Sequence, residues 1–416
     1  MYDLVMLDNY GANNISRDEA VYLISLHNDF SNERIRPRNR NDIFLYLYGF
    51  FGEQKNFQTN FSYIDSFSRE KYIMDVLSCK EHPDNTFGIN VPEEFFEIKN
   101  FSTDEYSSLV FLVLLMFINS NGVIDATLIP EVLKNPIFSK DNIISVLNQN
   151  STSIDEFRSS SLKRQFLYSK PIIKIGDSFV SANVFLMTAL FQNSNYWIMR
   201  NAYQNKHSQK FINAFGIYFE MYIEELLDFC LSKKQYLKIP TVNTGKRADW
   251  LINIDEYSFI VEQKSSLSIL DIKQNQPDIE AMKKHILNNW GEAVKQLSET
   301  QLALQIEQPI KIILVYEDYY KAKCLEELFT LNSELENDYN YWLMTIDEFE
   351  MLFYTYKTNP KLFIEIIEEK IALEHSLSST GREIEYLLHK KDIINNKYLQ
   401  DRGIRELYNK LKNSFY

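Results

Sequence analysis

Cysteine, glycine and proline are scarce in this chain of 416 residues. Its three cysteines, Cys79, Cys230 and Cys324, are far apart and form no CxxC pair. This spacing argues against a zinc site and a disulfide framework, and a reducing cytoplasm is its simplest interpretation. With only 11 glycines and 10 prolines, few residues interrupt regular structure, so we expect long helices and few irregular turns.

Long apolar runs and an export signal are also missing. Residues 1–20 contain no basic segment followed by an apolar stretch, so we expect no signal peptide. The most apolar segment runs from Leu109 to Ile118, which is about half of the roughly 20 residues that a membrane-spanning helix needs. We therefore expect a cytoplasmic protein with no membrane partner, in which residues 109–118 form a buried helix.

Basic residues are outnumbered by acidic ones. The chain has 44 lysines and arginines against 57 aspartates and glutamates, which gives a formal net charge of −13. Such a charge argues against nucleic-acid binding by the whole surface, but it leaves room for a local basic groove. One segment has arginine at every second position, and it is either a solvated loop or a phosphate-contacting arm. Its arginines are Arg34, Arg36, Arg38 and Arg40.

The length and the hydrophobic content of 45% predict two or three domains with sizeable cores. Residues 1 to about 165 show apolar residues mainly at helical spacing. A serine-rich stretch over 151–161 predicts a boundary or an exposed loop, and residues 172–180 predict a hairpin that leads into a helix. We assign 1–200 to a mainly helical accessory domain for regulation or substrate binding, 201–358 to an α/β domain, and 359–416 to a helical extension.

The α/β domain is predicted from the order of its patterns. A long amphipathic helix over 210–234 precedes three strands, and a further helix precedes a strongly apolar strand. The strands are expected at 236–242, 247–254, 257–265 and 309–317, and the second helix at 278–304. A last strand and helix follow over 341–356. This mixed order predicts a small sheet with helices on both sides.

The second and third strands form a predicted hairpin with a two-residue turn at Asp255–Glu256. That register places Asp249 opposite Glu262, with β-carbons about 5 Å apart. Lys264 points to the same face as Glu262, because side chains alternate along a strand. Arg247 would then lie opposite Lys264.

Two facing carboxylates destabilise a sheet unless something neutralises them. Oxygen ligands from two carboxylates suit Mg²⁺ or Mn²⁺, and a nearby lysine can position an attacking water. This combination indicates hydrolysis of a phosphodiester. The alternative is a cross-strand salt-bridge cluster on a solvated surface. The apolar residues at alternating positions, Trp250, Ile252, Phe259 and Val261, argue against that alternative.

Asp249, followed on the next strand by Glu262-Gln263-Lys264, resembles the PD-(D/E)XK nuclease superfamily, and Glu220 lies on the helix before them. The resemblance covers about Phe211 to Phe349. It implies a restriction-endonuclease-like core, in which a central mixed sheet is flanked by helices. Ala248 stands where the family name has proline, which many members also lack.

The resemblance also implies roles for these residues. Asp249 and Glu262 would bind Mg²⁺, or Mn²⁺, and Lys264 would be the catalytic lysine. Glu220 is similar to an additional acidic ligand of the family, and the main-chain carbonyl of Gln263 would be a further ligand. Gln296, on the following helix, is similar to a glutamine of some members. For Glu220 and Gln296 the alternative is an ordinary position on a helix surface.

The function implied is that of an Mg²⁺-dependent endonuclease that acts on DNA, in the manner of a bacterial defence or restriction effector. Lys246 and Arg247 are candidates for contact with the phosphates of the nucleic acid. The helical regions could form a homo-oligomer or bind a protein partner. Two alternatives stay open: a non-catalytic nucleic-acid-binding or assembly module of the same fold, and a nuclease directed at RNA.

Overall fold

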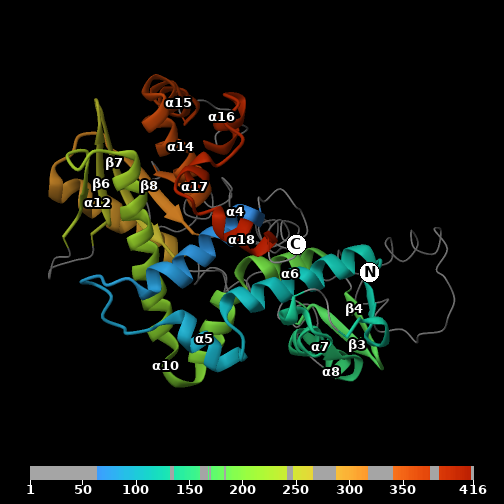
Figure 1. The fold of residues 1–416 in the computed structure, drawn as a ribbon. Coiled ribbons are helices and arrows are strands. Elements are labelled where there is room, and N and C mark those ends of the chain that lie inside the picture. The colour runs from blue at the N-terminus through green and yellow to red at the C-terminus, as the bar shows by residue number, and fades with distance from the viewer. Residues whose placement is uncertain are drawn as a thin grey trace, which may run out of the picture.

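The computed structural model describes residues 63–131, 135–159, 167, 170–181, 184–240, 247–265, 287–316, 341–374 and 384–413. These residues form a mixed α/β structure with two mixed sheets (Figure 1). The candidate phosphate contacts Arg34, Arg36, Arg38, Arg40 and Lys246 lie outside the described residues, so their predicted roles stay predictions.

The first described segment is helical, as predicted. Ser102 begins the longest helix of this segment, because its side chain accepts the backbone N–H of Glu105 while Glu105 binds the backbone N–H of Ser102. The apolar residues 109–118 lie in this largely buried helix. The helices are α4 (Tyr63–Lys71), η1 (Tyr72–Val76), η2 (Leu77–Cys79), α5 (Val91–Lys99) and α6 (Thr103–Asn119).

The described helices can be compared, by length and apolar character, with what a membrane span requires. None of them alone has the length and apolar character that a span requires, and α5 with α6 reaches the threshold only as a pair bent by 56°.

A small sheet follows, in the strand order β1-β4-β3-β2. The predicted hairpin at 172–180 is confirmed, and Gly176 supplies its turn with a φ of +60°. Residues 151–159 form a strand and a helix, so the exposed-loop alternative is wrong for them: Ser151 and Thr152 are buried in a strand that pairs with β3 in parallel, and the alternative of a boundary stays a prediction. Hydrogen bonding of the sheet and of the Thr152 hydroxyl to Glu156 satisfies these polar residues. The elements are β1 (Val123–Asp125), η3 (Ala126–Leu128), η4 (Pro136–Phe138), α7 (Lys140–Gln149), β2 (Ser151–Ser153), α8 (Ile154–Ser159), β3 (Ile172–Ile175) and β4 (Ser178–Ser181).

Helix α10 (Val184–Cys230) bends back on itself. The ring centroids of Tyr196 and Phe215 are 4.7 Å apart, whereas a straight helix would separate residues at this spacing by roughly 28 Å. Tyr203 and Phe211 are also in ring contact, at 5.9 Å, so the bend lies near these residues. The predicted domain boundary at residue 200 falls inside this element, which therefore belongs to both regions.

A buried carboxyl lies beside the first arm of α10. Glu70 accepts the backbone N–H of Tyr196 at 2.9 Å and the side-chain amide of Asn195 at 3.2 Å. Burial nevertheless raises the pKa of Glu70 to about 8, and these hydrogen bonds offset that rise only in part. The carboxyl is therefore protonated in the folded protein at neutral pH.

Glu70→Gln should stabilise the protein above neutral pH. The unfolded chain releases this proton near pH 4.5 and the folded chain near pH 8, so stability is full below the lower value and falls as pH rises through the higher one. We expect a gain of about 4–5 kcal/mol at pH 8 and little change at pH 4.5, measured by urea unfolding. The matched control is Glu97→Gln on the exposed face of α5. Equal stability of Glu70→Gln and the unsubstituted protein at pH 8 would contradict the assignment.

The larger sheet has the order β5-β6-β7-β8-β9. Strands β5, β6 and β7 are antiparallel neighbours, while β8 and β9 continue in parallel with β7. The predicted series of helix, three strands, helix and strand is therefore present. The bounds are β5 (Tyr236–Lys238), β6 (Trp250–Ile254), β7 (Tyr257–Lys264), β8 (Ile310–Val315) and β9 (Tyr341–Thr345).

Helices cover both faces of this sheet. One face carries Trp250, Ile252, Phe259, Val261 and other apolar residues into the main core, which it shares with α10 and α14 (Ile346–Thr358). The opposite face contacts α12 (Glu292–Leu304), which η5 (Leu287–Gly291) precedes. The charged residues of the predicted site belong to this second face.

The C-terminal region is helical, as predicted, and Gly403 breaks it with a φ of +70°. Gly381, the other predicted break, lies outside the described residues. The helices are α15 (Pro360–Glu374), α16 (Ile384–Lys390), α17 (Lys397–Asp401) and α18 (Glu406–Asn413).

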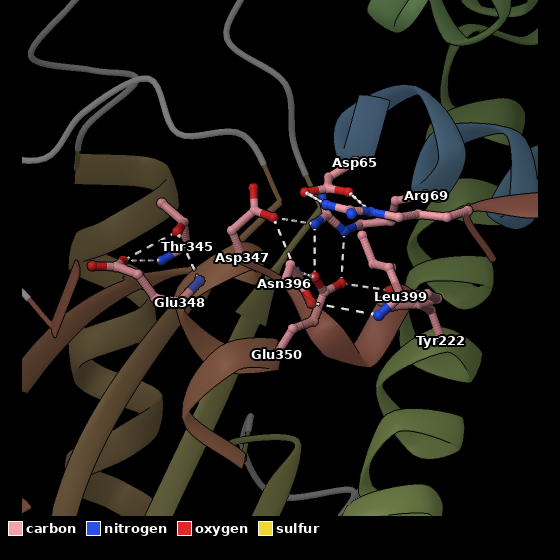
Figure 2. Close-up of polar contacts among 10 residues, drawn as sticks. Asp65, Arg69, Tyr222, Thr345, Asp347, Glu348, Glu350, Asn396 and Leu399 are labelled. Carbon is pink, nitrogen blue, oxygen red and sulfur yellow. Dashed lines mark hydrogen bonds and ion pairs between the residues drawn. The ribbon is translucent and has the colours of Figure 1, made fainter. Parts of the chain in front are cut away.

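A buried polar network joins the two ends of the described chain, as Figure 2 shows. Arg69 of α4 donates two hydrogen bonds to Glu350 of α14, at 2.7 Å each, and also pairs with Asp347. Tyr222 of α10 and Asn396, which caps α17, donate to the same Glu350 carboxylate. The network thus ties the accessory helices to the core and to the C-terminal extension.

Candidate active site

The hairpin β6–β7 has the predicted register. Trp250 lies opposite Val261 and Ile254 opposite Tyr257, with Asp255 and Glu256 as the two turn residues. Asp255 adopts a φ of +50°, in the left-handed region that such a tight turn requires. Asp249 directly precedes the first paired residue of β6, so the same register extended by one position brings it beside Glu262.

Asp249 occupies the point where the two strands separate. Its Oδ2 accepts the backbone N–H of Gln263 at 2.7 Å, so the side chain continues the ladder of β7. Burial and then the negative charge of Glu262 raise the pKa of Asp249 well above its ordinary value. The hydrogen bond from Gln263 and the charge of Lys264 act in the opposite direction but do not cancel this effect. The two carboxylates are therefore close enough to repel each other.

Lys264 and Gln296 complete this cluster. The Lys264 ammonium contacts Glu262 Oε1 at 2.6 Å and Gln296 Oε1 at 3.1 Å. Gln296 in turn donates its amide to the backbone carbonyl of Arg247 at 3.2 Å. The Glu262 side chain is 4% exposed and that of Lys264 is 19% exposed, so the ammonium lies between a buried carboxylate and the surface.

Helix α12 holds the start of β6 in place. The Thr300 hydroxyl accepts the backbone N–H of Ala248 at 2.8 Å and donates to the carbonyl of Gln296. The Arg247 guanidinium was expected opposite Lys264, but it points toward Glu299 of α12 at 3.5 Å. The strand pairing ends before Arg247, so cross-strand register no longer determines where its side chain lies.

The side chain of Gln263 contacts one face of the sheet, and its main chain contacts Asp249. Its side-chain oxygen accepts the indole N–H of Trp250 at 3.1 Å, and Trp250 belongs to the apolar face. Only the main chain of Gln263 is directed toward Asp249. This arrangement is compatible with the predicted main-chain role, which stays a prediction.

Glu220 lies near the cluster but is bound by another residue. Its carboxylate forms an ion pair with Lys238 at the end of β5. The Lys238 ammonium also contacts Asp84 Oδ2 at 2.7 Å. The negative charge of Glu220 makes a small contribution to the raised pKa of Asp249. Glu220 is therefore a neighbour of the two carboxylates that pairs with Lys238, and its predicted role as a metal ligand stays a prediction.

The donor set of this cluster fits a hard divalent cation. Asp249 and Glu262 offer oxygen atoms and repel each other, so a cation would relieve a cost that folding imposes. Among the residues that the structure describes, no group of three or more His, Cys, Asp or Glu side chains could hold a metal ion. A site with two carboxylates is still suited to Mg²⁺, which usually keeps several waters and takes one or two carboxylates from the protein.

Comparisons with protein-family models, curated proteins and solved structures find no match for this chain. We therefore infer the function from the geometry of the cluster itself.

Two residues of this region were not expected from the sequence. Lys238 could have been noticed as a lysine in the strand that precedes Asp249. Asp84 gives no local signal, because it lies in a loop of the accessory region and reaches Lys238 only in the folded chain.

Proposed function

We propose that this protein is a metal-dependent nuclease of the PD-(D/E)XK type that hydrolyses phosphodiester bonds of DNA in the cytoplasm. The observation that carries the proposal is the convergence of Asp249, Glu262, Lys264 and Gln296 at the edge where β6 and β7 separate. The order and direction of β5 to β9, with α10 and α12 on opposite faces, support a restriction-endonuclease-like core around it.

The residues of the cluster would divide the chemistry among them. Asp249 and Glu262 would hold the cation, and Gln263 fixes the Asp249 carboxylate through its backbone N–H. Lys264 would orient a water and stabilise negative charge on the phosphate, and Gln296 holds the Lys264 ammonium in place. A bound Mg²⁺ would supply a water of lowered pKa and neutralise phosphate oxygens.

A plasmid assay tests this proposal. We expect the full-length protein to nick or linearise supercoiled plasmid with Mg²⁺ and to lose this activity in EDTA and in Asp249→Ala. Glu256→Gln, at the exposed turn of the same hairpin, is the matched control and should keep full activity. Equal cleavage by Asp249→Ala and the control would refute the site. Cleavage of RNA but not of DNA would reassign the substrate.

A non-catalytic nucleic-acid-binding or assembly module is the second candidate. Two observations favour it: the described residues hold no three-membered group of metal-binding side chains, and Lys264 already forms an ion pair with Glu262. Such a module needs neither a metal nor a free lysine. Absence of cleavage with every divalent cation and with both nucleic acids, in a protein that still binds them, would decide for it.

A further inference from the structure

The acidic ridge of α10 faces basic side chains along its length. We use this name for Glu220 and, one turn later in the second arm, the adjacent residues Glu224 and Glu225. Glu225 pairs with Lys80, and Glu224 lies 3.6 Å from His82. The loop that carries Lys80 and His82 comes from the accessory region, and it runs alongside the ridge toward Glu220.

Lys238 closes this series at the candidate site. Its ammonium contacts Glu220 on one side and Asp84, from the same accessory loop, on the other. The Glu220 side chain is 15% exposed, so its negative charge would be costly without the ammonium beside it. Lys238 is also adjacent to Asp249 through the backbone, because the N–H of Ile239 donates to the Asp249 carbonyl at 2.8 Å.

We propose that Lys238 acts as a built-in cation of this site by holding the Glu220 carboxylate. Asp249 and Glu262 then bind one divalent cation, and no second cation binds at Glu220. The inference rests on the proposed function and deepens it, because it assigns the number of metal ions and a positioning residue. Glu220 then acts as the partner of Lys238 and not as a metal ligand.

The charges of the cluster are consistent with a single ion. When a bound cation keeps Asp249 ionised, Asp84, Glu220, Asp249 and Glu262 would contribute four negative charges, and Lys238 and Lys264 two positive ones. The two remaining negative charges equal the charge of one Mg²⁺ or Mn²⁺. Removal of the Lys238 ammonium would leave three, and it would release Glu220 to bind a second ion.

The test is a Mn²⁺ titration of the full-length protein, in which electron paramagnetic resonance measures the free ion. We expect one bound Mn²⁺ per chain in the unsubstituted protein and two in Lys238→Met. The double variant Lys238→Met/Glu220→Gln should return to one, because it lacks the released carboxylate. Lys238→Arg, which keeps the charge, should bind one ion. Lys233→Met, which removes a lysine paired with Asp228 at 2.5 Å, is the matched control and should also bind one.

Glu220→Gln alone gives a second measurement that does not depend on the folding of a Lys238 variant. We expect it to bind one Mn²⁺ with unchanged affinity, whereas loss of a true ligand would weaken binding about tenfold or more. Weakened binding in Glu220→Gln, or one ion in Lys238→Met, would overturn the inference. Two bound ions in an unsubstituted protein that cleaves DNA would overturn this inference but leave the proposed function standing. Absence of Mn²⁺ binding would overturn both this inference and the proposed metal site.

Discussion

Arg69→Met should lower the free energy of unfolding by about 3–5 kcal/mol, the typical cost of removing one partner from a buried ion pair. The Arg69 side chain is 3% exposed and the Glu350 side chain is fully buried, so water cannot replace the lost guanidinium. Burial already raises the pKa of Glu350, and Arg69 is the largest influence that opposes this rise. Without Arg69, the donors that Glu350 keeps among the described residues, Tyr222 and Asn396, are both neutral.

Urea unfolding followed by tryptophan fluorescence measures this effect. The double variant Arg69→Met/Glu350→Leu should be more stable than Arg69→Met alone, because it removes both buried charges. Lys390→Met is the control: this exposed lysine pairs with Glu369 on the surface, and its loss should leave the unfolding midpoint unchanged. A midpoint for Arg69→Met equal to that of the control would contradict a stabilising role for the network.

Lys264→Ala should reduce the rate of DNA hydrolysis by about 10²–10⁴-fold, the usual contribution of a positioned acid–base group. The ammonium has fixed partners on two sides, Glu262 and Gln296, so its position is determined before substrate binds. Gln296→Ala removes one of these partners and should cost only about fivefold, the equivalent of one hydrogen bond.

Single-turnover cleavage of plasmid at saturating Mg²⁺ separates this loss from weakened metal binding. Lys295→Ala is the matched control, since Lys295 neighbours Gln296 on α12 but has an exposed side chain. Its rate should equal that of the unsubstituted protein. A rate for Lys264→Ala within twofold of the control would remove Lys264 from the mechanism.

The centre of the candidate site could be predicted because its determinants are local. Alternation of Trp250 and Ile252 with charged or polar neighbours fixed the faces of the hairpin, and the turn at Asp255–Glu256 fixed its register. Gln296 was singled out by the resemblance as a glutamine of the following helix, and in the structure its Oε1 lies 3.1 Å from the Lys264 ammonium.

The remaining features depend on contacts between distant parts of the chain. Lys238 meets Asp84 across 154 residues, and Arg69 meets Glu350 across 281 residues. The strand at Ser151–Ser153 was missed because pairing with β3, rather than its own polar residues, makes it a strand. Likewise, the bend of α10 is revealed only by aromatic contacts between its arms, such as Tyr196 with Phe215. Periodicity within one segment contains no information about such pairs.

The ion pair between Asp65 and Arg405 has a consequence for synthesis of the chain. Arg405 of the C-terminal region donates to both oxygens of Asp65 in α4, at 2.5 and 2.8 Å, across 340 residues. Domains generally fold as they leave the ribosome, at about 5–20 residues per second. Helix α4 must therefore wait for this partner until 340 further residues have been translated, and the segment that carries the candidate site emerges in between. A ribosome that stalls before Arg405 would leave the chain with the candidate-site segment made, but with α4 and the C-terminal region not yet joined.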